Sequence, residues 1–453
     1  MNRKIFFAII ALCSVLIFFQ TCIAKVTKEE ADLLKSTLTP MGAERAGNKE
    51  GTIPTWDGGY TKVPEGWKPG DYRPDFFADE KPLYSITAKN MDQHLDKLAE
   101  GSKALFKKYP AFRIDVYPTH RSAAAPQYVY DATYQNALNA ELTDGGLNIK
   151  NAYNGIPFPI PKTGVEYVFN HLLRWRGVET KMWFNNFLMT SSGKLITIVM
   201  ALNYEQYSYY RNDISYEEWN GGSWYMLQLQ LAPSYKAGES ILLCDPIDFA
   251  HKGRQTWQYL VGQRRVRRSP QISFDTPDFV ASGHNFFDEA LVYNGSPERY
   301  NWKFIEKKEM VVPYNDNDFL KKSMEEVYTP NYMNPDYLRW ELHRVYVVEG
   351  TLAEGKRHVV PKRRFYLDED TWAIVLYDGW DAQGELWRFG VALSLLAPDY
   401  PCIVTTSNVL YNIQTGAYGG NNIVNGQPQQ MYQVEVKENR FYTPQNLSAM
   451  GVR

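Results

Sequence analysis

The chain has 453 residues and a formal net charge of −2, from 49 lysines and arginines against 51 aspartates and glutamates. This near balance argues against nucleic acid as a partner, because nucleic-acid-binding proteins usually carry a basic footprint. The length allows one large domain or two ordinary ones. The 32 tyrosines and 12 tryptophans favour strands, cavity walls and interfaces.

Residues 1–24 predict a secretory signal peptide. Arg3 and Lys4 form a basic start, residues 5–19 carry no charge, and Cys22 and Ala24 supply the small side chains that a signal peptidase reads. The apolar run is too short to span a bilayer comfortably. We therefore expect export, with a soluble mature protein that begins near Lys25.

Residues 25–86 predict a short helix followed by an extended arm. Residues 27–37 begin with Thr27 as a candidate N-cap and have acidic residues in the first turn. Residues 40–82 are dense in glycine and proline and show no periodicity. We expect this stretch to lie as an ordered arm over the body of the protein.

Residues 87–453 predict one domain of the mainly β, α+β class. From residue 181 onward, short apolar runs separated by turn residues predict strands, and few connections are long enough for parallel crossovers. The expected fold is a large antiparallel sheet covered by a few helices. Helical spacing places three of these helices at 88–109, 163–175 and 316–328, and Thr163 and Glu166 form a capping box at the second.

The stretch 339–389 predicts an antiparallel meander with apolar side chains on both faces. An antiparallel sheet commonly leaves one face to solvent, so each face here needs a cover. Helices can cover one face, and a ligand cavity or a second layer of the protein can cover the other. We expect an apolar cavity of a few hundred Å³, walled partly by Trp340, Tyr346, Trp372 and Trp387.

A basic run on one predicted strand has two interpretations. It contains Arg264, Arg265, Arg267 and Arg268. The structural interpretation pairs these arginines with the acidic turn at Asp368, Glu369 and Asp370. The functional interpretation is recognition of an anionic headgroup or of a partner protein, because the guanidinium fork matches phosphate and carboxylate.

Sequence motifs for catalysis and for cofactor or metal binding are absent. The chain has no paired metal-ligand spacing, nucleophile elbow, P-loop or dinucleotide fingerprint. We therefore expect no cofactor, no metal and no catalytic residue. Cys244 and Cys402 could pair in an oxidising compartment or remain two separate buried thiols, and the sequence leaves both open.

Several long segments resemble one family of secreted Gram-negative proteins whose members are labelled outer-membrane lipoprotein-sorting proteins. The resemblance spans nearly the whole mature chain and is carried by residues 42–59, 155–177, 256–270, 299–315 and 339–372. It implies a fold like that of the lipoprotein carriers LolA and LolB, an incomplete antiparallel barrel with helices as a lid over an apolar cavity.

The resemblance also implies a function. Genes of this family often neighbour transporters of the resistance-nodulation-division type, which implies a periplasmic carrier for a lipid or other hydrophobic ligand, working with such a transporter or an outer-membrane protein. Two alternatives stay open: a hydrolase acting on a hydrophobic substrate, and an accessory subunit of a transport complex that binds no ligand.

Overall fold

The computed structural model describes residues 25–269, 274–278 and 282–450. The predicted signal peptide, residues 1–24, lies outside the described residues. Among the described helices, none is long and apolar enough to cross a membrane.

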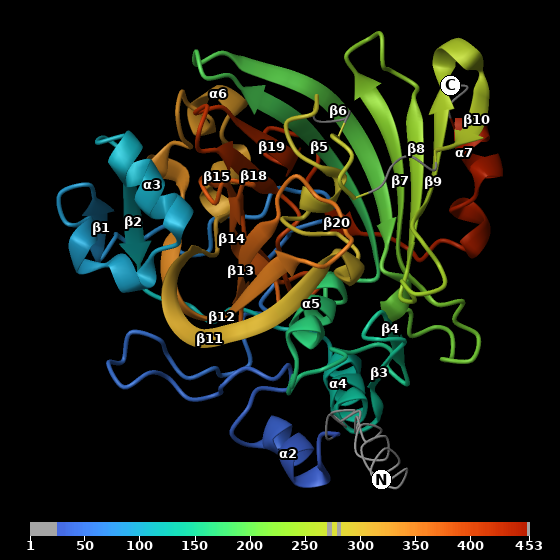
Figure 1. Cartoon of the computed structure of the whole chain (residues 1–453), viewed down its shortest axis with the longest axis horizontal. Helices are drawn as coiled ribbons and strands as arrows, with labels where there is room; N and C mark the ends of the chain where they lie inside the picture. The colour runs from blue at the N-terminus through green and yellow to red at the C-terminus, as the bar shows by residue number, and fades with distance from the viewer. Residues whose placement is uncertain (1–24, 270–273, 279–281, 451–453) are drawn as a thin grey trace, which may run out of the picture.

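A single large sheet of 16 strands dominates the molecule (Figure 1). Its strands are β1 (Tyr84–Thr87), β2 (Arg113–Tyr117), β5 (Glu179–Met189), β6 (Leu195–Gln206), β7 (Gly222–Ala232), β8 (Ser240–Pro246), β9 (Gln255–Leu260), β10 (Arg265–Arg268), β11 (Tyr300–Pro313), β12 (Trp340–Leu352), β13 (Lys362–Asp368), β14 (Ile374–Trp380), β15 (Leu386–Ala392), β18 (Asn408–Asn412), β19 (Tyr418–Ile423) and β20 (Tyr432–Gln433). Two separate hairpins pair β3 (Glu141–Thr143) with β4 (Asn148–Lys150) and β16 (Leu395–Ala397) with β17 (Cys402–Val404).

The helices of the described residues are few and short. The α-helices are α2 (Lys28–Asp32), α3 (Glu100–Lys108), α4 (Gln127–Asn139), α5 (Gly164–Leu172), α6 (Met324–Val327) and α7 (Pro444–Met450). The 3-10 turns are η1 (Leu33–Lys35), η2 (Met91–Gln93), η3 (Leu95–Lys97), η4 (Ser208–Tyr210), η5 (Val261–Gln263), η7 (Phe287–Glu289), η8 (Pro297–Arg299), η9 (Asn317–Lys321), η10 (Pro335–Tyr337) and η11 (Asn439–Phe441).

The sheet is an open half-barrel. Its strand order is β1-β2-β12-β13-β14-β15-β18-β19-β5-β6-β7-β8-β9-β10, with β11 added on β12 and β20 on β5. The described strand pairs are antiparallel except β2 with β12. The two ends of the order, β1 and β10, do not pair with each other. The predicted class, a large mainly antiparallel sheet with a few helices, is confirmed.

Tertiary contacts decide where the helices begin. The expected helix over 88–109 is α-helical only from Glu100, with η2 and η3 before it. The carboxylate of Asp378 on β14 accepts hydrogen bonds from the backbone amides of Glu100 and Gly101 at 2.9 and 2.8 Å. Asp378 therefore caps the N-terminus of α3 from a strand that is distant in sequence. By contrast, α5 begins where the sequence predicts, with the Thr163 amide donating to the Glu166 carboxylate at 3.0 Å.

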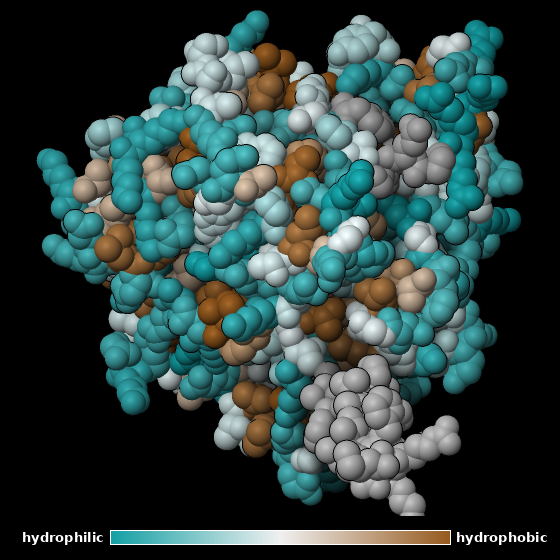
Figure 2. Space-filling model, in the orientation of Figure 1, coloured by the Kyte–Doolittle hydropathy of each residue, from teal (hydrophilic) through white to brown (hydrophobic). Residues whose placement is uncertain are grey.

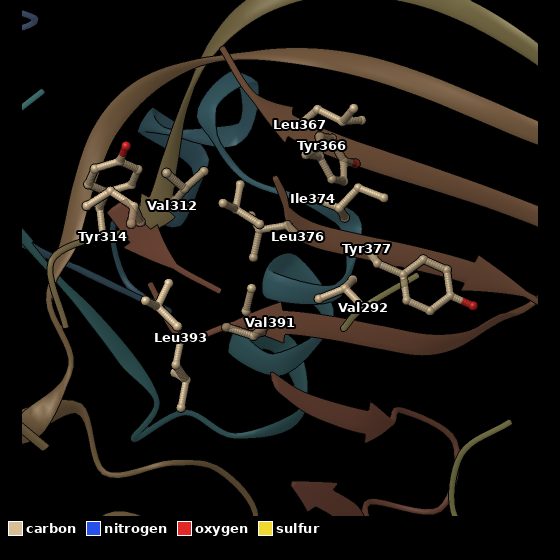
Figure 3. Close-up of a cluster of buried hydrophobic side chains, with 14 of the residues drawn as sticks. Val292, Val312, Tyr314, Tyr366, Leu367, Ile374, Leu376, Tyr377, Val391 and Leu393 are labelled. Atoms are coloured by element: carbon tan, nitrogen blue, oxygen red, sulfur yellow. The ribbon is translucent and has the colours of Figure 1, made fainter. Parts of the chain in front are cut away.

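The strands β11 to β15, which we call the filled half, have a packed core on both faces. Figure 3 shows the side chains of this cluster pointing toward one another, among them Val312, Leu376 and Val391. On one face α3 comes so close that the ring of Phe389 occupies the space beside Gly101. On the other face Tyr377 stacks on Phe365 with ring centroids 5.1 Å apart. No face of this meander is left for a ligand among the described residues.

Candidate ligand-binding site

The strands β5 to β9, which we call the hollow half, present a wall of mixed chemistry to the inside of the half-barrel. In register, Glu205 lies opposite Met226, Met226 opposite Leu243, and Leu243 opposite Thr256. These four side chains share the inward face because successive residues of a strand point to opposite sides.

The outward face of the same strands is covered by the C-terminal helix. Leu227 and Leu242 are fully buried there in a cluster with Tyr442 and Leu447, and α7 lies beside β8 to β10 at the right of Figure 1. Because α7 already covers this outward face, the inward face is the one that remains available for binding.

A cavity of about 70 Å³ lies against the inward face. Its surface is mainly apolar, and its apolar lining consists of Trp224, Met226, Ile241, Leu243, Phe287, Ala290 and Leu291. Its polar lining consists of Asn186, Glu205, Gln228, Arg254, Thr256, Asp278, Asn294, Asn421 and Asn422. The strands supply one wall, and Asp278, Phe287, Ala290, Leu291 and Asn294 supply the other.

The second wall belongs to a stretch that we call the cover segment, residues 282–296. Buried ion pairs hold it to the filled half. Asp288 bridges to Arg363 at 2.8 Å and Glu289 to Arg388 at 2.6 Å, and all four groups are almost fully buried. Burial acts to raise the pKa of Asp288, but the Arg363 guanidinium and His358 lower that pKa to about 2.

The backbone of the cover segment is strained where it meets the cavity. Leu291 and Val292 both have left-handed backbone angles, with φ of 55° and 68°. Such a conformation is uncommon for leucine and a genuine outlier for the β-branched valine, and each instance costs about 1–3 kcal/mol. Both side chains are 2% exposed, so packing on the filled half holds the segment in this shape.

Several buried polar groups of the cavity wall have no hydrogen-bond partner within the described residues. They are Gln228 Nε2, Thr256 Oγ1 and Asn421 Nδ2. Other polar groups of the wall have hydrogen-bond partners. The Trp224 indole donates to the Glu205 carboxylate at 3.2 Å, and Arg254 forms a bidentate ion pair with Asp245 at 2.7 Å. The wall can therefore offer hydrogen bonds as well as apolar contact.

Two polar clefts lie elsewhere. One of about 330 Å³ opens on the outward side of β7 to β9, where it includes Cys244, Lys252 and Trp257. Another of about 180 Å³ is lined by several acids, including Asp75, Glu80 and Asp318. Both have more polar than apolar lining, which does not suit a hydrophobic ligand.

The aromatic residues predicted to wall a cavity lie in the filled half instead. Trp340 and Tyr346 are buried in the core, and Trp387 packs edge-on against Phe286 at 6.2 Å. Trp372 is 0% exposed and stacks on Tyr346 at 5.1 Å. Among the described residues, none of these four lines the three cavities above. Tyr167 of α5 packs against Tyr346 and Trp372, where we expected a ligand.

Trp372 ties the N-terminal arm to the sheet. Its indole donates to the carbonyl of Met41 at 2.8 Å, and its backbone is held at a left-handed φ of 62°. Tyr167 of α5 packs against it at 6.0 Å. The residue that we expected to face a ligand is therefore a junction between the arm, α5 and the meander.

The predicted pairing of the basic strand with the acidic turn is wrong. Arg265, Arg267 and Arg268 are exposed on β10 and Arg264 is exposed at the turn before it; none of the four forms an ion pair with a described residue. Asp368, Glu369 and Asp370 are buried in the filled half. Asp370 pairs with Arg121 at 2.6 Å, and Glu369 with Arg344 at 3.0 Å and Lys307 at 2.6 Å. The three acidic residues lie close to basic residues other than those of β10, and the sequence alone did not identify these partners.

One set of buried side chains could hold a metal ion. Ligand atoms of His343, Asp368 and Asp370 all lie within 4.8 Å of one another, although the sequence shows no metal-ligand spacing. Arg121 already bonds to both oxygens of Asp370 at 2.9 and 2.6 Å, and His343 bonds to Glu341 at 3.0 Å. Burial lowers the pKa of His343, but the Glu341 carboxylate outweighs it and raises that pKa. The arrangement is explained as an ion-pair network.

Cys244 and Cys402 are both free thiols. Cys402 is buried, with Sγ 3.6 Å from the carbonyl oxygen of Trp175, whereas Cys244 lies half-buried on β8. Of the two arrangements that the sequence left open, the structure has the separate thiols. Burial raises the pKa of each thiol to about 12.

Comparison with known proteins identifies a relative that covers 95% of this chain. The chain is 38% identical over 438 residues to the uncharacterized protein PA3922 of Pseudomonas aeruginosa, with 95% of each chain covered. Among solved structures it is similar to a Vibrio parahaemolyticus domain named for outer membrane lipoprotein sorting (14% identity, TM-score 0.43, covering 63% of this chain and 98% of that one).

Two further solved structures show weaker similarity. A DUF1329 family protein from Desulfovibrio piger has 12% identity and a TM-score of 0.40, covering 59% of this chain and 91% of that one. A LolA superfamily protein from Nitrosomonas europaea has 9% identity and a TM-score of 0.35, covering 62% of this chain and 98% of that one. The model of the family described as "Protein of unknown function (DUF1329)" matches residues 85–448, and the chain belongs to that family.

Proposed function

We propose that the protein is a carrier for a lipid or another hydrophobic ligand, which it binds at the inward face of the hollow half. The observation that carries this proposal is the mainly apolar cavity between β5 to β9 and the cover segment. Burial of apolar ligand surface would supply the affinity, at about 25 cal/mol per Å².

The cavity must enlarge to accept such a ligand. At about 70 Å³ it is smaller than the roughly 150 Å³ cavity that holds one benzene molecule. The cover segment is the wall whose displacement would enlarge the cavity. Among the described residues it forms no strand pairing with that wall, and its Asn294 carbonyl accepts a hydrogen bond from Arg254 at 2.9 Å. Release of the left-handed angles at Leu291 and Val292 would offset part of the cost of opening, at about 1–3 kcal/mol each.

The chemistry of the lining supports binding rather than hydrolysis. The described residues that line the cavity include no histidine, serine or cysteine, which are the usual bases and nucleophiles of hydrolases. Glu205 is the most buried acid there, and its carboxylate is occupied by the Trp224 indole and the Tyr207 hydroxyl. A carrier is therefore favoured over a hydrolase.

The surface gives less support to an accessory subunit that binds no ligand. Such a subunit would present a contiguous apolar patch to its partner. On the face shown in Figure 2, hydrophobic residues are scattered among hydrophilic ones. The exposed large apolar residues include Leu83, Ile196, Tyr235 and Val359, from separate parts of the chain.

We place the carrier in the periplasm, working with an envelope transporter of the resistance-nodulation-division type or an outer-membrane protein. The charged start and apolar run of residues 1–24 support export. N-terminal sequencing of the exported protein should begin at or within a few residues of Lys25. A mature form that retains Met1 or carries lipid on Cys22 would contradict this placement.

A filling substitution tests the binding site. Met226 and Leu229 are both half-buried on β7 but point to opposite faces of the sheet. Met226→Trp should fill the cavity and weaken the binding of Nile red, an uncharged hydrophobic dye, by about tenfold or more. Leu229→Trp is the matched control and should stay within about twofold of wild type. Equal dye binding by wild type and Met226→Trp would contradict the assigned site.

A further inference from the structure

The basic strand β10 extends the hollow half beyond β9, and alternate residues of it face inward. Arg267 lies opposite Gln258 on β9, and Arg265 lies opposite Leu260. Gln258 and Leu260 have the same parity along β9 as Thr256, which lines the cavity. Because side chains alternate between faces, Arg265 and Arg267 project from the same face of the sheet as the cavity wall.

The neighbouring arginine on this strand points the other way. Arg268 lies opposite Trp257, and Val266 opposite Tyr259. Trp257, Tyr259 and Val266 all belong to the cluster under α7. The strand therefore divides its charge between the two faces, with Arg265 and Arg267 on the inward one.

These two arginines differ in their pairing from the buried arginines of the fold. Arg254, Arg363 and Arg388 all form close ion pairs with carboxylates. Arg265 and Arg267 are exposed and have no ion-pair partner among the described residues. Among the described strands β10 ends the strand order, so these exposed guanidinium groups lie at the edge of the described sheet.

The edge is close enough to the cavity for one molecule to span both. Neighbouring strands lie about 4.8 Å apart and successive same-face residues about 6.8 Å apart, so the Cα atoms of Arg267 and Thr256 are separated by about 8 Å. A guanidinium group extends a further several ångströms from its Cα. A chain buried beside Leu243 could therefore carry a headgroup that contacts Arg267.

The charges along this face indicate which end of such a ligand would lie in the cavity and which at the edge. Arg254 also lines the cavity, but Asp245 neutralises it in an ion pair at 2.7 Å. Glu205 and Asp278 of the lining would repel an anion there, whereas the edge carries the two arginines. Between these two ends, Gln228 Nε2 and Thr256 Oγ1 lack hydrogen-bond partners among the described residues and can bond to the neutral polar atoms of an ester or amide.

We infer that the ligand is an anionic amphiphile, with its apolar chain in the cavity and its phosphate or carboxylate headgroup on Arg265 and Arg267. This inference rests on the proposed carrier function and names the class of its cargo. Paired guanidinium groups favour such oxyanions because they donate parallel charge-assisted hydrogen bonds.

The test compares two matched double variants of the mature chain. Arg265→Gln with Arg267→Gln removes two positive charges from the inward face. Arg264→Gln with Arg268→Gln removes the same charge from the same stretch, at the preceding turn and on the outward face. Binding of dodecyl phosphate, dodecanol and inorganic phosphate is measured for each protein by calorimetry.

We expect dodecyl phosphate to bind about tenfold or more weakly to the inward double variant and within about twofold of wild type to the other. Dodecanol should bind all three proteins alike. Equal weakening of dodecyl phosphate by both double variants would overturn the inference, because it would indicate only long-range attraction. Binding of inorganic phosphate as tight as that of dodecyl phosphate would also overturn it, in favour of a site for a free anion.

The inference and the carrier proposal fail in different ways. If dodecanol and dodecyl phosphate bind wild type equally and neither responds to the inward double variant, the anionic headgroup is wrong but the carrier stands. If neither amphiphile binds wild type, the carrier proposal fails and the inference falls with it.

Discussion

The filled half and the hollow half of this sheet are built from strands with similar apolar faces, but these faces are covered differently. In the filled half, α3 covers one face, and α5, the N-terminal arm and the cover segment cover the other, so that Trp372 and Leu376 are 0% exposed. In the hollow half, α7 covers the outward face, whereas the cover segment and α5 reach the inward face but leave a cavity against β7 to β9. The comparison teaches that a binding site in this fold depends on which strands lack a second layer, since apolar strand faces occur in both halves.

Both halves bury ion pairs, including Arg254–Asp245 in the hollow half, but the strand β10 at the edge of the hollow half holds its charge differently. The filled half buries ion pairs such as Asp288–Arg363 and Arg121–Asp370, whereas β10 leaves its arginines in solvent. Buried pairs cost desolvation and tolerate little change. Exposed arginines can exchange water for a ligand.

The largest expected effect is the loss of the ion pair that anchors the cover segment. Arg363→Met leaves Asp288 buried without its main cationic partner and should lower the free energy of unfolding by about 3–5 kcal/mol. The adjacent Arg364, half-exposed and paired with Glu349 at 3.0 Å, is the control, and Arg364→Met should cost about 1 kcal/mol or less. Urea unfolding measures both, and equal losses would show that the segment is not anchored by this pair.

Raising the pH from about 4 to 8 should weaken the filled half. Burial raises the pKa of Asp316 to about 8, although backbone amides of Arg339 and Ser394 donate to it. A folded-state pKa above the unfolded value means that its stabilising contribution is complete below about pH 4. That contribution falls as the pH rises toward 8, by a few kcal/mol in total.

Asp316→Asn isolates this effect, because the amide does not titrate. Thermal unfolding between pH 5 and 9 should fall less steeply for the variant than for wild type. Parallel curves for the two proteins would assign the pH dependence to other groups.

A matched pair of leucines compares the packing of the halves directly. Leu376 is 0% exposed in the filled half, and Leu243 is 5% exposed beside the cavity. Leu376→Ala should cost about 4 kcal/mol and Leu243→Ala about 2 kcal/mol, since truncation costs most where the removed side chain is packed tightly on all sides. If the two variants lose equal stability in urea unfolding, the hollow half is packed as tightly as the filled one.

The smallest effect concerns the thiols and leaves stability unchanged. Because burial raises the pKa of Cys244 and Cys402 to about 12, both should react slowly with iodoacetamide at pH 8 in the folded protein. Unfolding the mature chain without reductant should expose two reactive thiols to mass analysis. An unreactive, unreduced chain would indicate a disulfide after all.

Local rules predicted much of the fold. Short apolar runs between turn residues indicated the strands, and the Thr163–Glu166 pair indicated the start of α5. Thr27 caps α2 as expected, with its side chain accepting a hydrogen bond from the Glu30 amide. Each of these signals involves residues that are close in sequence, so the local structure that it predicts does not depend on distant parts of the chain.

The site could not be predicted in the same way. The meander has two apolar faces, as the sequence indicates, but only the structure shows that α5 and Trp372 fill one of them. The cover segment has no periodic pattern, and its anchors join Asp288 to Arg363 and Glu289 to Arg388. Asp370 likewise pairs with Arg121 across 249 positions. Pairs of residues so far apart in the sequence cannot be predicted from local sequence patterns.

Quenching of tryptophan fluorescence by a brominated long-chain alcohol tests the central claim most directly, because bromine quenches only the indoles that it contacts. Trp224 lines the cavity of the hollow half, whereas Trp387 lies on β15 in the filled half. We predict saturable quenching in wild type and in Trp387→Phe, and its loss in Trp224→Phe. Quenching that persists in Trp224→Phe and disappears in Trp387→Phe would place the ligand in the filled half and contradict the account.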